Sequence, residues 1–398
     1  MNKRIYFVAI SILFVIMQTA CTNVEDDMQT ACTNVEGDND RPQYDTDIFL
    51  DEYGDTLNYD MRIVTDVWAR EVFIPSKIET IVTLGPGATR LATYLGVVDM
   101  IIGAETQTSN FNILMDFSPV VYPIFEKKPI VGRGGGSGEN NAYVEALIKL
   151  DPDVILAAFT PEAANSLQEQ TNIPVVAVRY TSTGLANETF FNGLNVFAQV
   201  VNKESRAIEI ENFVESLRRD LSERTINIAL NNRPTVYAGA ITFAGQRGFG
   251  GTYSNFGPLV AINALNVADT VFEEGFYEVS FEQILLWDPD IIFIDPGNIA
   301  LINGEYASNP NFFNSLTAIQ NGRVYTLPSF NFSAQNISYG FINAYFAGTI
   351  LYPDQFEDIF IEDIADKVLT FFLGINTFEI MKQNGLFFGN INIGLPNL

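Results

Sequence analysis

The chain has 398 residues, of which 47% are hydrophobic, so it can bury the cores of two ordinary domains. It carries 22 Lys and Arg against 48 Asp and Glu, a formal net charge of −26, which argues against nucleic acid as a partner and against electrostatic binding to anionic lipid. It contains no histidine, which excludes Ser-His-Asp and Cys-His catalysis, imidazole zinc sites and histidine-ligated haem.

The N-terminus has the pattern of a secretory signal peptide. Lys3 and Arg4 precede a nearly uninterrupted apolar run from Ile5 to Met17. A helix of that length rises about 20 Å, which is shorter than the roughly 30 Å hydrocarbon core of a bilayer. The run therefore predicts a signal peptide over residues 1–20 rather than a membrane-spanning helix.

The two cysteines, Cys21 and Cys32, both lie near the N-terminus, so no disulfide is expected in the rest of the chain, and of the two Cys32 lies far from the apolar run. Thr19-Ala20-Cys21 resembles a lipobox, in which small residues precede a cysteine that becomes lipidated. We take Cys21 as the lipidation site, and an ordinary secreted protein cut near Ala20 is the alternative. Residues 21–60 are acidic, polar and rich in turn formers, which predicts a flexible tether.

From residue 61 onward, short apolar runs alternate with helical stretches, a pattern typical of α/β domains. Ile78–Leu84 is rich in β-branched residues and predicts a strand, which Gly85-Pro86-Gly87 ends. A helix is expected over Ala88–Leu95 and a strand over Val97–Gly103. Further strands are expected at residues 154–158, 175–178, 235–238, 291–295 and 324–327.

Two halves of the chain repeat one unit in register. Residues 144–158 (VEALIKLDPDVILAA) match residues 281–295 (FEQILLWDPDIIFID) in a glutamate, apolar helical positions, Asp-Pro-Asp and an apolar strand. Proline ends a helix and sets the turn into a buried strand, so we interpret Asp-Pro-Asp as a structural turn and not as a pair of catalytic carboxylates. The repeat predicts two similar α/β lobes, at residues 61–186 and 229–398.

Residues 187–228, between the lobes, predict two connecting helices. The second, Lys203–Ile226, carries apolar residues along one face and would reach about 36 Å. A long helix is a stiff connector, so the lobes are not expected to swing widely.

From about residue 62 to the C-terminus, the chain resembles the iron-siderophore and cobalamin class of periplasmic binding proteins. In chain order, the matching segments are 67–72 (VWAREV), 82–89 (VTLGPGAT), 95–97 (LGV), 130–132 (IVG), both Asp-Pro-Asp helices, 321–325 (NGRVY), 351–353 (LYP) and 371–374 (FFLG). The resemblance implies two Rossmann-like α/β lobes joined by a long rigid helix, which is the class III periplasmic binding protein fold.

The resemblance also implies a function without chemistry of its own. The chain would be the monomeric substrate-binding component of an ABC importer, anchored by lipid outside the cytoplasm, where it delivers a small molecule to the permease and its ATPase. Family members dock onto permease arginines through glutamates of their lobes, for which Glu126 and Glu273 are candidates. Many members have Thr-Glu where this chain has Thr89-Arg90, so these glutamates cannot be mapped residue by residue.

Ligands of open α/β sheets bind at the carboxyl ends of the strands. The loops at those ends carry three arginines, which suit carboxylate, catecholate or phosphate groups, together with aromatic residues that suit an organic ligand body. The candidate ligand-binding residues are Pro86, Arg133, Thr160, Arg179, Tyr180, Phe243, Arg247, Tyr253, Phe330 and Phe332. Each arginine could instead pair with a surface carboxylate, and most aromatic residues of the chain belong to cores. Residues 132–138 (GRGGGSG) lack the Lys-Ser/Thr of a P-loop, so a nucleotide is not expected.

The leading hypothesis for the ligand is a ferric chelate of the siderophore kind, with no intrinsic cofactor and iron only as part of the ligand. Cobalamin and haem are alternatives, and ferric ion bound directly by tyrosines and carboxylates stays open. Bare zinc or manganese is disfavoured, because their binders usually use histidine. An enzyme of this architecture would lack a nucleophile with its base, whereas a surface sensor that works without a permease is a further alternative.

Overall fold

The computed structural model describes residues 60–106, 113–114, 116–117, 125, 127–135, 141–180, 184–374 and 378–394, and two short strands before them. These strands, β1 (Phe49–Leu50) and β2 (Thr56–Leu57), pair antiparallel. Contacts divide the chain into two units, Met1–Met61 and Arg62–Leu398. The predicted signal peptide and Cys21 lie outside the described residues, as does most of the predicted tether. No helix within the described ranges is both long enough and apolar enough to cross a membrane.

A hairpin of β3 (Met61–Thr65) and β4 (Glu71–Pro75) precedes the first parallel sheet. Asp66 fixes its turn, because Asp66 Oδ1 accepts hydrogen bonds from the backbone N–H groups of Trp68 (2.9 Å) and Arg70 (3.0 Å). Ala69 adopts a left-handed conformation in this turn (φ 59°). Glycine adopts that conformation most easily, so an alanine there is conformationally costly.

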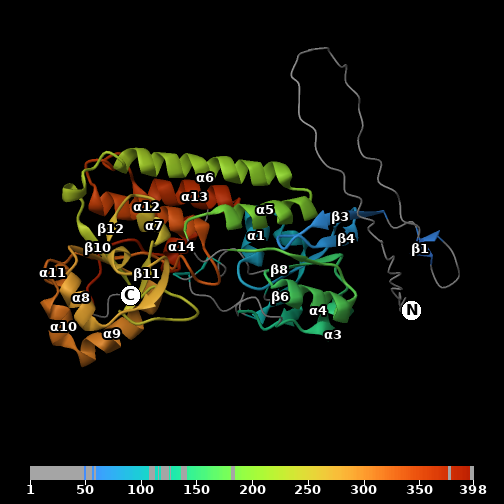
Figure 1. Cartoon of the computed structure of the whole chain (residues 1–398), viewed down its shortest axis with the longest axis horizontal. Helices are drawn as coiled ribbons and strands as arrows, with labels where there is room; N and C mark the ends of the chain where they lie inside the picture. The colour runs from blue at the N-terminus through green and yellow to red at the C-terminus, as the bar shows by residue number, and fades with distance from the viewer. Residues whose placement is uncertain are drawn as a thin grey trace, which may run out of the picture. The chain divides into compact units, whose positions relative to one another are not determined.

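The first lobe is built on a five-stranded sheet whose strands are all parallel (Figure 1). Its spatial order is β7 (Ile130–Gly132), β6 (Ile101–Glu105), β5 (Ile81–Leu84), β8 (Val154–Ala157) and β9 (Val175–Ala177). Helices α1 (Ala88–Tyr94), α3 (Val144–Leu150) and α4 (Pro161–Thr171) belong to the same lobe. The central strands are completely buried, as parallel strands covered on both faces must be.

The second lobe has a four-stranded parallel sheet and a separate hairpin. The sheet order is β12 (Leu265–Asn266), β10 (Thr235–Gly239), β14 (Ile291–Ile294) and β15 (Val324–Thr326). The antiparallel hairpin pairs β11 (Gly251–Ser254) with β13 (Gly275–Glu278). The helices of this lobe are α7 (Gly257–Val260), α8 (Phe281–Trp287), α9 (Ile299–Ser308), α10 (Pro310–Ser315) and α11 (Thr317–Gln320).

The sequence repeat corresponds to one structural unit in each lobe, in which α3 leads to β8 and α8 leads to β14. Both helices end at the first aspartate of Asp-Pro-Asp, which adopts the left-handed conformation (φ 52° at Asp151 and 33° at Asp288). The second aspartate of each motif ties the turn to a neighbouring strand or its approach: Asp153 accepts from the N–H of Thr80 (2.8 Å), and Asp290 from the N–H of Thr235 (2.8 Å). The interpretation of these residues as structural turns is confirmed.

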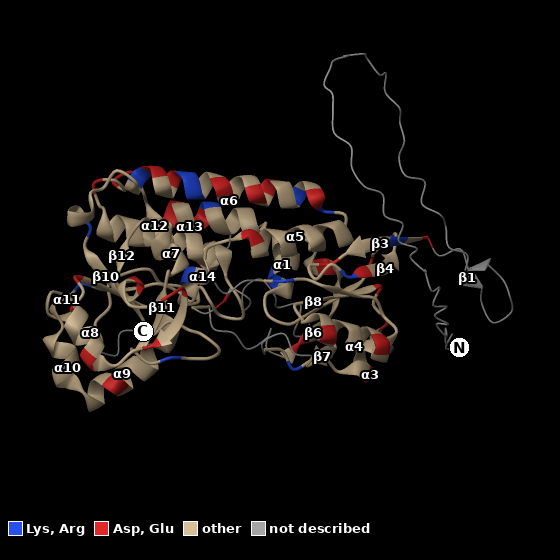
Figure 2. Cartoon of the chain, viewed as in Figure 1, with Lys and Arg blue, Asp and Glu red and all other residues tan. Residues whose placement is uncertain are grey.

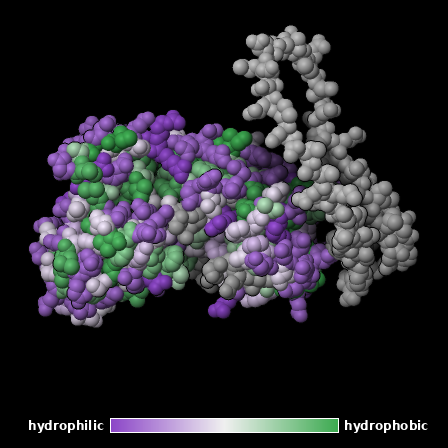
Figure 3. Space-filling model, in the orientation of Figure 1, coloured by the Kyte–Doolittle hydropathy of each residue, from purple (hydrophilic) through white to green (hydrophobic). Residues whose placement is uncertain are grey.

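Two connecting helices follow the first lobe, α5 (Glu188–Val200) and α6 (Glu204–Thr225). Charged residues of both signs lie along α6 (Figure 2), and mostly hydrophilic side chains cover it in the same view (Figure 3). The opposite face of α6 is buried at Ala207, Ile210, Val214, Leu217 and Leu221. Three further helices complete the chain, α12 (Ile337–Leu351), α13 (Ile361–Leu373) and α14 (Phe378–Gln383). One continuous apolar cluster joins side chains of both lobes, α6, α12 and α13.

The predicted strand at Val97–Gly103 differs from the structure in its bounds. Residues Val98–Met100 form a single 3-10 turn, and the strand begins only at Ile101. The other predicted strands are confirmed to within three residues at each end.

Candidate ligand-binding site

Each parallel sheet has one point at which the chain reverses its direction of travel across the sheet. In the first sheet this point lies between β5 and β8, and in the second it lies between β10 and β14. Connections from the two strands at such a point run to opposite sides, which leaves room for a ligand beyond the strands' carboxyl ends. The loops there are 85–87 and 158–160 in the first lobe, and 240–250 and 295–298 in the second.

Pro86 and Thr160 lie at the switch point of the first lobe, which is the place between β5 and β8 where the direction of travel reverses. The loop that contains Pro86 packs closely on the end of β8: a Cβ atom added to Gly85 (φ +81°) would lie 3.2 Å from the carbonyl oxygen of Ala158. Pro86 is half-buried and Thr160 is exposed. The Thr160 hydroxyl accepts a hydrogen bond from the N–H of Ala163 (3.3 Å), so it caps α4.

Trp68, from the turn of the β3–β4 hairpin, also reaches this edge. Its indole Nε1–H donates to the carbonyl oxygen of Phe159 (2.9 Å), and the guanidinium carbon of Arg179 lies 5.1 Å from the centroid of its ring. Arg179 is exposed, as is Arg133, which follows β7. Trp68 was not among the residues predicted for the site, because its hairpin is distant in sequence from the loops that it contacts.

Phe276, a residue of β13, is the common neighbour of Phe243, Arg247 and Tyr253 in the second lobe. Phe276 was not predicted for the site from the sequence. The rings of Phe243 and Phe276 stack with their centroids 4.9 Å apart, and the Arg247 guanidinium carbon lies 4.9 Å from the centroid of Phe276. Arg247 Nε also donates to the carbonyl oxygen of Phe243 (2.8 Å). Stacking on Phe276 and this hydrogen bond hold the arginine at the switch point of the second lobe.

Tyr253 and Phe330 are only 2% exposed and pack in the core beneath the loops. Both contact Phe256, with ring centroids 6.4 Å from Tyr253 and 5.6 Å from Phe330. Tyr253 is buried because it belongs to strand β11 and not to a loop. In this structure the two side chains support the loops from within and present almost no surface to a ligand.

Tyr180 and Phe332 lie at a different place, where each contacts Arg90. The Tyr180 ring packs on the backbone of Gly87 so closely that an added Cβ would lie 2.6 Å from it, which together with a φ of +80° requires glycine there. The guanidinium carbon of Arg90 lies 5.9 Å from the centroid of the Tyr180 ring. Arg90 Nη2 donates to the carbonyl oxygen of Phe332 (3.1 Å).

One buried and one half-buried carboxyl group lie at the strand ends, and neither was predicted for the site from the sequence. Asp295 follows β14 and accepts hydrogen bonds from Ser329 Oγ (2.5 Å) and from the N–H of Gly297 (2.9 Å). Burial raises its pKa to about 6, although these hydrogen bonds oppose the shift. Glu105 ends β6 and accepts from the N–H of Gly85 (3.0 Å), and burial raises its pKa to about 7. Glu105 is the last residue of an apolar strand, and Asp295 directly follows one. This position is the sequence feature from which both could have been predicted.

The raised pKa of Glu105 predicts a dependence of stability on pH. The folded carboxyl keeps its proton up to about pH 7, whereas the unfolded one loses it near 4.5, so the free energy of unfolding falls as pH rises between these values. The loss should reach up to about 3 kcal/mol, because each pKa unit corresponds to about 1.4 kcal/mol. Glu105→Gln should remove this component, as seen in melting temperatures at about pH 5 and about pH 8. The exposed control Glu162→Gln should melt like the parent, and an unchanged pH dependence in Glu105→Gln would refute the prediction.

The three arginines predicted for the site share one electrostatic feature. Within the described part of the chain, Arg133, Arg179 and Arg247 form no ion pair within 4 Å. Glu278 is a nearby carboxylate, and the charge of Arg247 opposes the rise of its pKa that burial causes. Among the same residues, no group of three or more Cys, Asp or Glu could hold a metal ion. The strand-end loops therefore present positive charge in a chain of net charge −26.

Comparison with known proteins is consistent with this arrangement. The sequence pattern of the family described as periplasmic binding protein matches residues 81–330. The chain belongs to this family. It is a substrate-binding component of an ABC importer and not an enzyme, and it works outside the cytoplasm. The implied class III fold, with two α/β lobes, is confirmed.

The relatives are distant in sequence but similar over most of their length. A molybdate-binding protein, MolA, from Haemophilus influenzae is 24% identical over 328 residues, which cover 77% of this chain and 89% of MolA. A periplasmic solute binding protein from Veillonella parvula superposes with a TM-score of 0.65 at 21% identity, covering 82% of this chain and 97% of that one. Helicobacter pylori CeuE with Ni(II) bound has a TM-score of 0.59 at 17% identity, covering 81% and 99%. At these identities the structural likeness shows the fold alone.

Proposed function

We propose that this binding protein captures an anionic metal chelate, of the ferric-siderophore kind, and delivers it to its permease. The observation that carries the proposal is the set of loop arginines, Arg133, Arg179 and Arg247, without ion-pair partners within 4 Å in the described chain. Guanidinium groups bind carboxylate and catecholate oxygens through paired hydrogen bonds. Arginines already paired with surface carboxylates would not serve this purpose.

Aromatic surface next to these arginines favours a chelate over a bare oxyanion. Phe243 and Phe276 are half-buried and Trp68 is exposed, and each lies beside an arginine. An organic ligand body can stack on such rings, whereas a small tetrahedral oxyanion gains nothing from them. Molybdate, which the name of the Haemophilus relative indicates as its ligand, is the competing outcome.

Iron would enter only as part of the ligand, with no cofactor resident in the protein. We further propose that a lipid on Cys21 holds the monomeric protein at the outer side of the membrane, since the lipobox-like Thr19-Ala20-Cys21 follows a signal-peptide pattern. Cobalamin and haem are the alternatives that the ligand test addresses, and a sensor role without a permease is an alternative that the uptake measurement addresses.

Titration of the purified full chain tests the ligand, by following intrinsic fluorescence with ferric catecholate, ferric citrate, haem, cobalamin and molybdate. We expect saturable binding at micromolar concentration or tighter, about −8 kcal/mol or better, for a ferric chelate. Tight binding of molybdate alone would show that the ligand is an oxyanion and not a chelate. Failure with all five would refute the ligand proposal.

The repeat also supports a proposal for permease docking. Glu145 in the first turn of α3 and Glu282 in the first turn of α8 occupy equivalent positions of the two lobes, and both are exposed. Each lies near an exposed aliphatic side chain, Ile148 (51% exposed) or Leu285 (40%), which are also equivalent. A permease with two related halves would meet the same acidic and apolar surface on each lobe.

The two glutamates selected from sequence, Glu126 and Glu273, do not belong to the repeated unit of residues 144–158 and 281–295. Glu126 lies outside the described residues. Glu273 is exposed in the segment between β12 and β13, which is not part of the repeated unit. We therefore propose Glu145 and Glu282 as the docking residues.

A further inference from the structure

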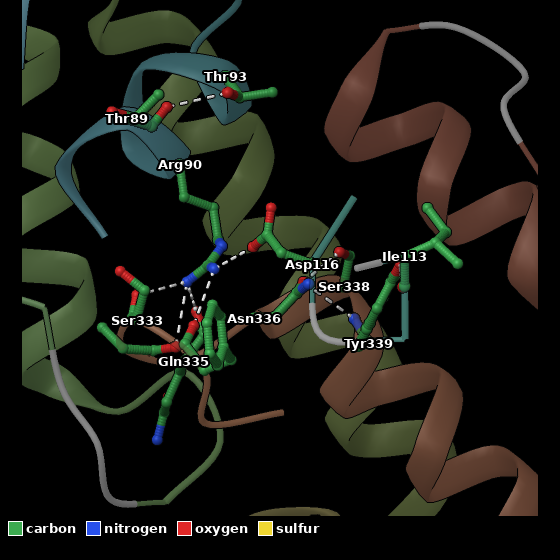
Figure 4. A network of polar contacts seen from close by, with 12 residues as sticks. Thr89, Arg90, Thr93, Ile113, Asp116, Ser333, Gln335, Asn336, Ser338 and Tyr339 are labelled. Carbon is green, nitrogen blue, oxygen red and sulfur yellow. Dashed lines mark hydrogen bonds and ion pairs between the residues drawn. The ribbon is translucent and has the colours of Figure 1, made fainter. Parts of the chain in front are cut away.

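Arg90 is almost completely buried, with 5% of its surface exposed, although it carries a full charge. It lies on α1 of the first lobe and forms an ion pair with Asp116 of the same lobe, whose side chain is 3% exposed (Figure 4). The rings of Phe117 and Tyr180 flank the guanidinium, each with its centroid 5.9 Å from the guanidinium carbon. Burial opposes the charged form, but the charge of Asp116, its hydrogen bond and the nearby Tyr180 and Tyr94 together raise the pKa of Arg90, so the side chain stays charged.

The same guanidinium binds four consecutive backbone carbonyl groups of the second lobe. Arg90 Nη1 donates to the carbonyl oxygens of Ser333 (3.1 Å), Ala334 (3.1 Å) and Gln335 (3.0 Å), and Nη2 donates to that of Phe332 (3.1 Å). These residues belong to the segment 327–336 between β15 and α12, more than 240 positions from Arg90 in the chain. One side chain therefore joins the two lobes through five acceptors, of which four lie on the second lobe.

The carbonyl groups converge on Arg90 because the backbone turns sharply there. Ser333 (φ 49°) and Ala334 (φ 67°) both adopt the left-handed conformation, which non-glycine residues rarely occupy in succession. A conformation of this kind persists only where surrounding contacts stabilise it. The hydrogen bonds from Arg90 to the carbonyl oxygens of Ser333 and Ala334 are contacts of this kind.

Other hydrogen bonds tie the same segment to the first lobe and to the chain that leaves it. The N–H of Ser329 donates to the carbonyl oxygen of Leu114 (2.8 Å), and Gln335 Nε2 donates to that of Gly184 (2.6 Å). Tyr339, in the first turn of α12, donates its hydroxyl to the carbonyl oxygen of Ile113 (2.8 Å). Among the side chains named in these hydrogen bonds, Arg90 is the charged one. It donates directly to the carbonyl groups of Ser333 and Ala334, which lie in the left-handed turn.

We propose that Arg90 is an interlobe latch, a positioning residue that clamps residues 332–335 of the second lobe to α1 and Asp116 and so limits how far the lobes separate. Separation at this seam has to break the four hydrogen bonds to the second lobe together, since they share one guanidinium. A buried ion pair contributes little net stability compared with apolar packing, so its value here lies in fixing one arrangement of the lobes. The latch also orients Phe332, whose carbonyl it holds.

The distance between two spin labels, one on each lobe, tests the latch. Because Cys21 and Cys32 are the only cysteines, the full chain with Cys21→Ser and Cys32→Ser takes labels only where new cysteines are placed. Lys149→Cys on α3 and Leu286→Cys on α8 are equivalent exposed positions away from the latch, and Leu286 is 80% exposed. Pulsed electron resonance then gives the distribution of interlobe distances in the parent and in the latch variants.

Arg90→Gln should shift this distribution to longer distances and broaden it, whereas Arg90→Lys, which keeps the charge but lacks the planar fork, should lie between Arg90→Gln and the parent. Asp116→Asn provides a second route, because it keeps the shape of the partner while removing its charge; should Arg90→Gln not fold, Asp116→Asn and Arg90→Lys decide the question. Circular dichroism establishes which variants are folded. A folded latch variant with the distribution of the parent would overturn the proposal.

Discussion

Reversing the charge of both proposed docking residues, with Glu145→Arg and Glu282→Arg, is expected to abolish permease-dependent uptake and to leave ligand affinity unchanged. Removing one partner of a charge pair that is buried in an interface weakens binding by about 2–5 kcal/mol. Reversing the charge adds repulsion at both lobes. The two side chains are exposed and lie on helices away from the switch-point loops, so the ligand contacts stay intact. Uptake of labelled ligand by cells that carry only the variant measures the effect.

The matched control for docking is Glu162→Arg with Glu357→Arg. Glu162 also lies in the first turn of a helix, so an arginine there meets the same unfavourable helix dipole, a cost of about 0.3–1 kcal/mol. Both control residues are exposed, Glu162 on α4 and Glu357 in the turn between α12 and α13. They do not occupy equivalent positions of the repeat. Normal uptake by the docking variant, or an equal loss in the control, would contradict the docking proposal.

Removal of two loop arginines, Arg133→Ala with Arg247→Ala, is expected to weaken binding of the anionic ligand about a hundredfold, and each single substitution at least about tenfold. A hydrogen bond to a charged group contributes about 1.5–3 kcal/mol, which is consistent with these losses. Neither residue has an ion-pair partner within 4 Å in the described structure, and the charge of Arg247 acts on the nearby carboxylate of Glu278. Calorimetric titration of each variant provides the measurement.

Arg219→Ala serves as the control for the arginines, because Arg219 is an exposed arginine on α6 with no ion pair in the described structure. It should bind the ligand like the parent. Arg247→Lys separates charge from geometry: the lysine keeps a positive charge but loses the fork and the stacking on Phe276, so its affinity should fall between parent and alanine. Unchanged affinity in both single alanine variants would show that the arginines do not bind the ligand.

The parallel strands were predictable because their signal is local. Ile291–Ile294 and Val154–Ala157 are short runs of apolar residues, directly behind an Asp-Pro-Asp turn that ends the preceding helix. The hairpin of β11 and β13 was missed because its strands pair residues far apart, such as Tyr253 with Phe276, and β11 follows a glycine-rich stretch that reads as a loop. As a result, Tyr253 was placed at a loop surface although it lies in the core.

The positions of the loops were also predictable, since the carboxyl ends of parallel strands meet at one edge of a sheet. Contacts between the loops were not predictable, because they join residues that are far apart in the sequence and share no local sequence pattern. Arg90 illustrates the difference: its sequence context showed only a departure from Thr-Glu, while its partners lie at Asp116 and at residues 332–335. Asp295 was overlooked because it was taken only as the end of a predicted strand, and Glu105 because it lies two residues beyond the predicted strand Val97–Gly103.

The strand-end loops are proposed to hold an anionic chelate through their arginines. The most direct test of this proposal is to titrate the purified full chain with two ferric complexes of similar size, an anionic catecholate and a neutral hydroxamate. The anionic complex is predicted to bind saturably, at micromolar concentration or tighter, and the neutral one at least about tenfold more weakly. Equal affinity for both complexes, or no binding of the anionic one, would show that the loop arginines do not select an anionic chelate.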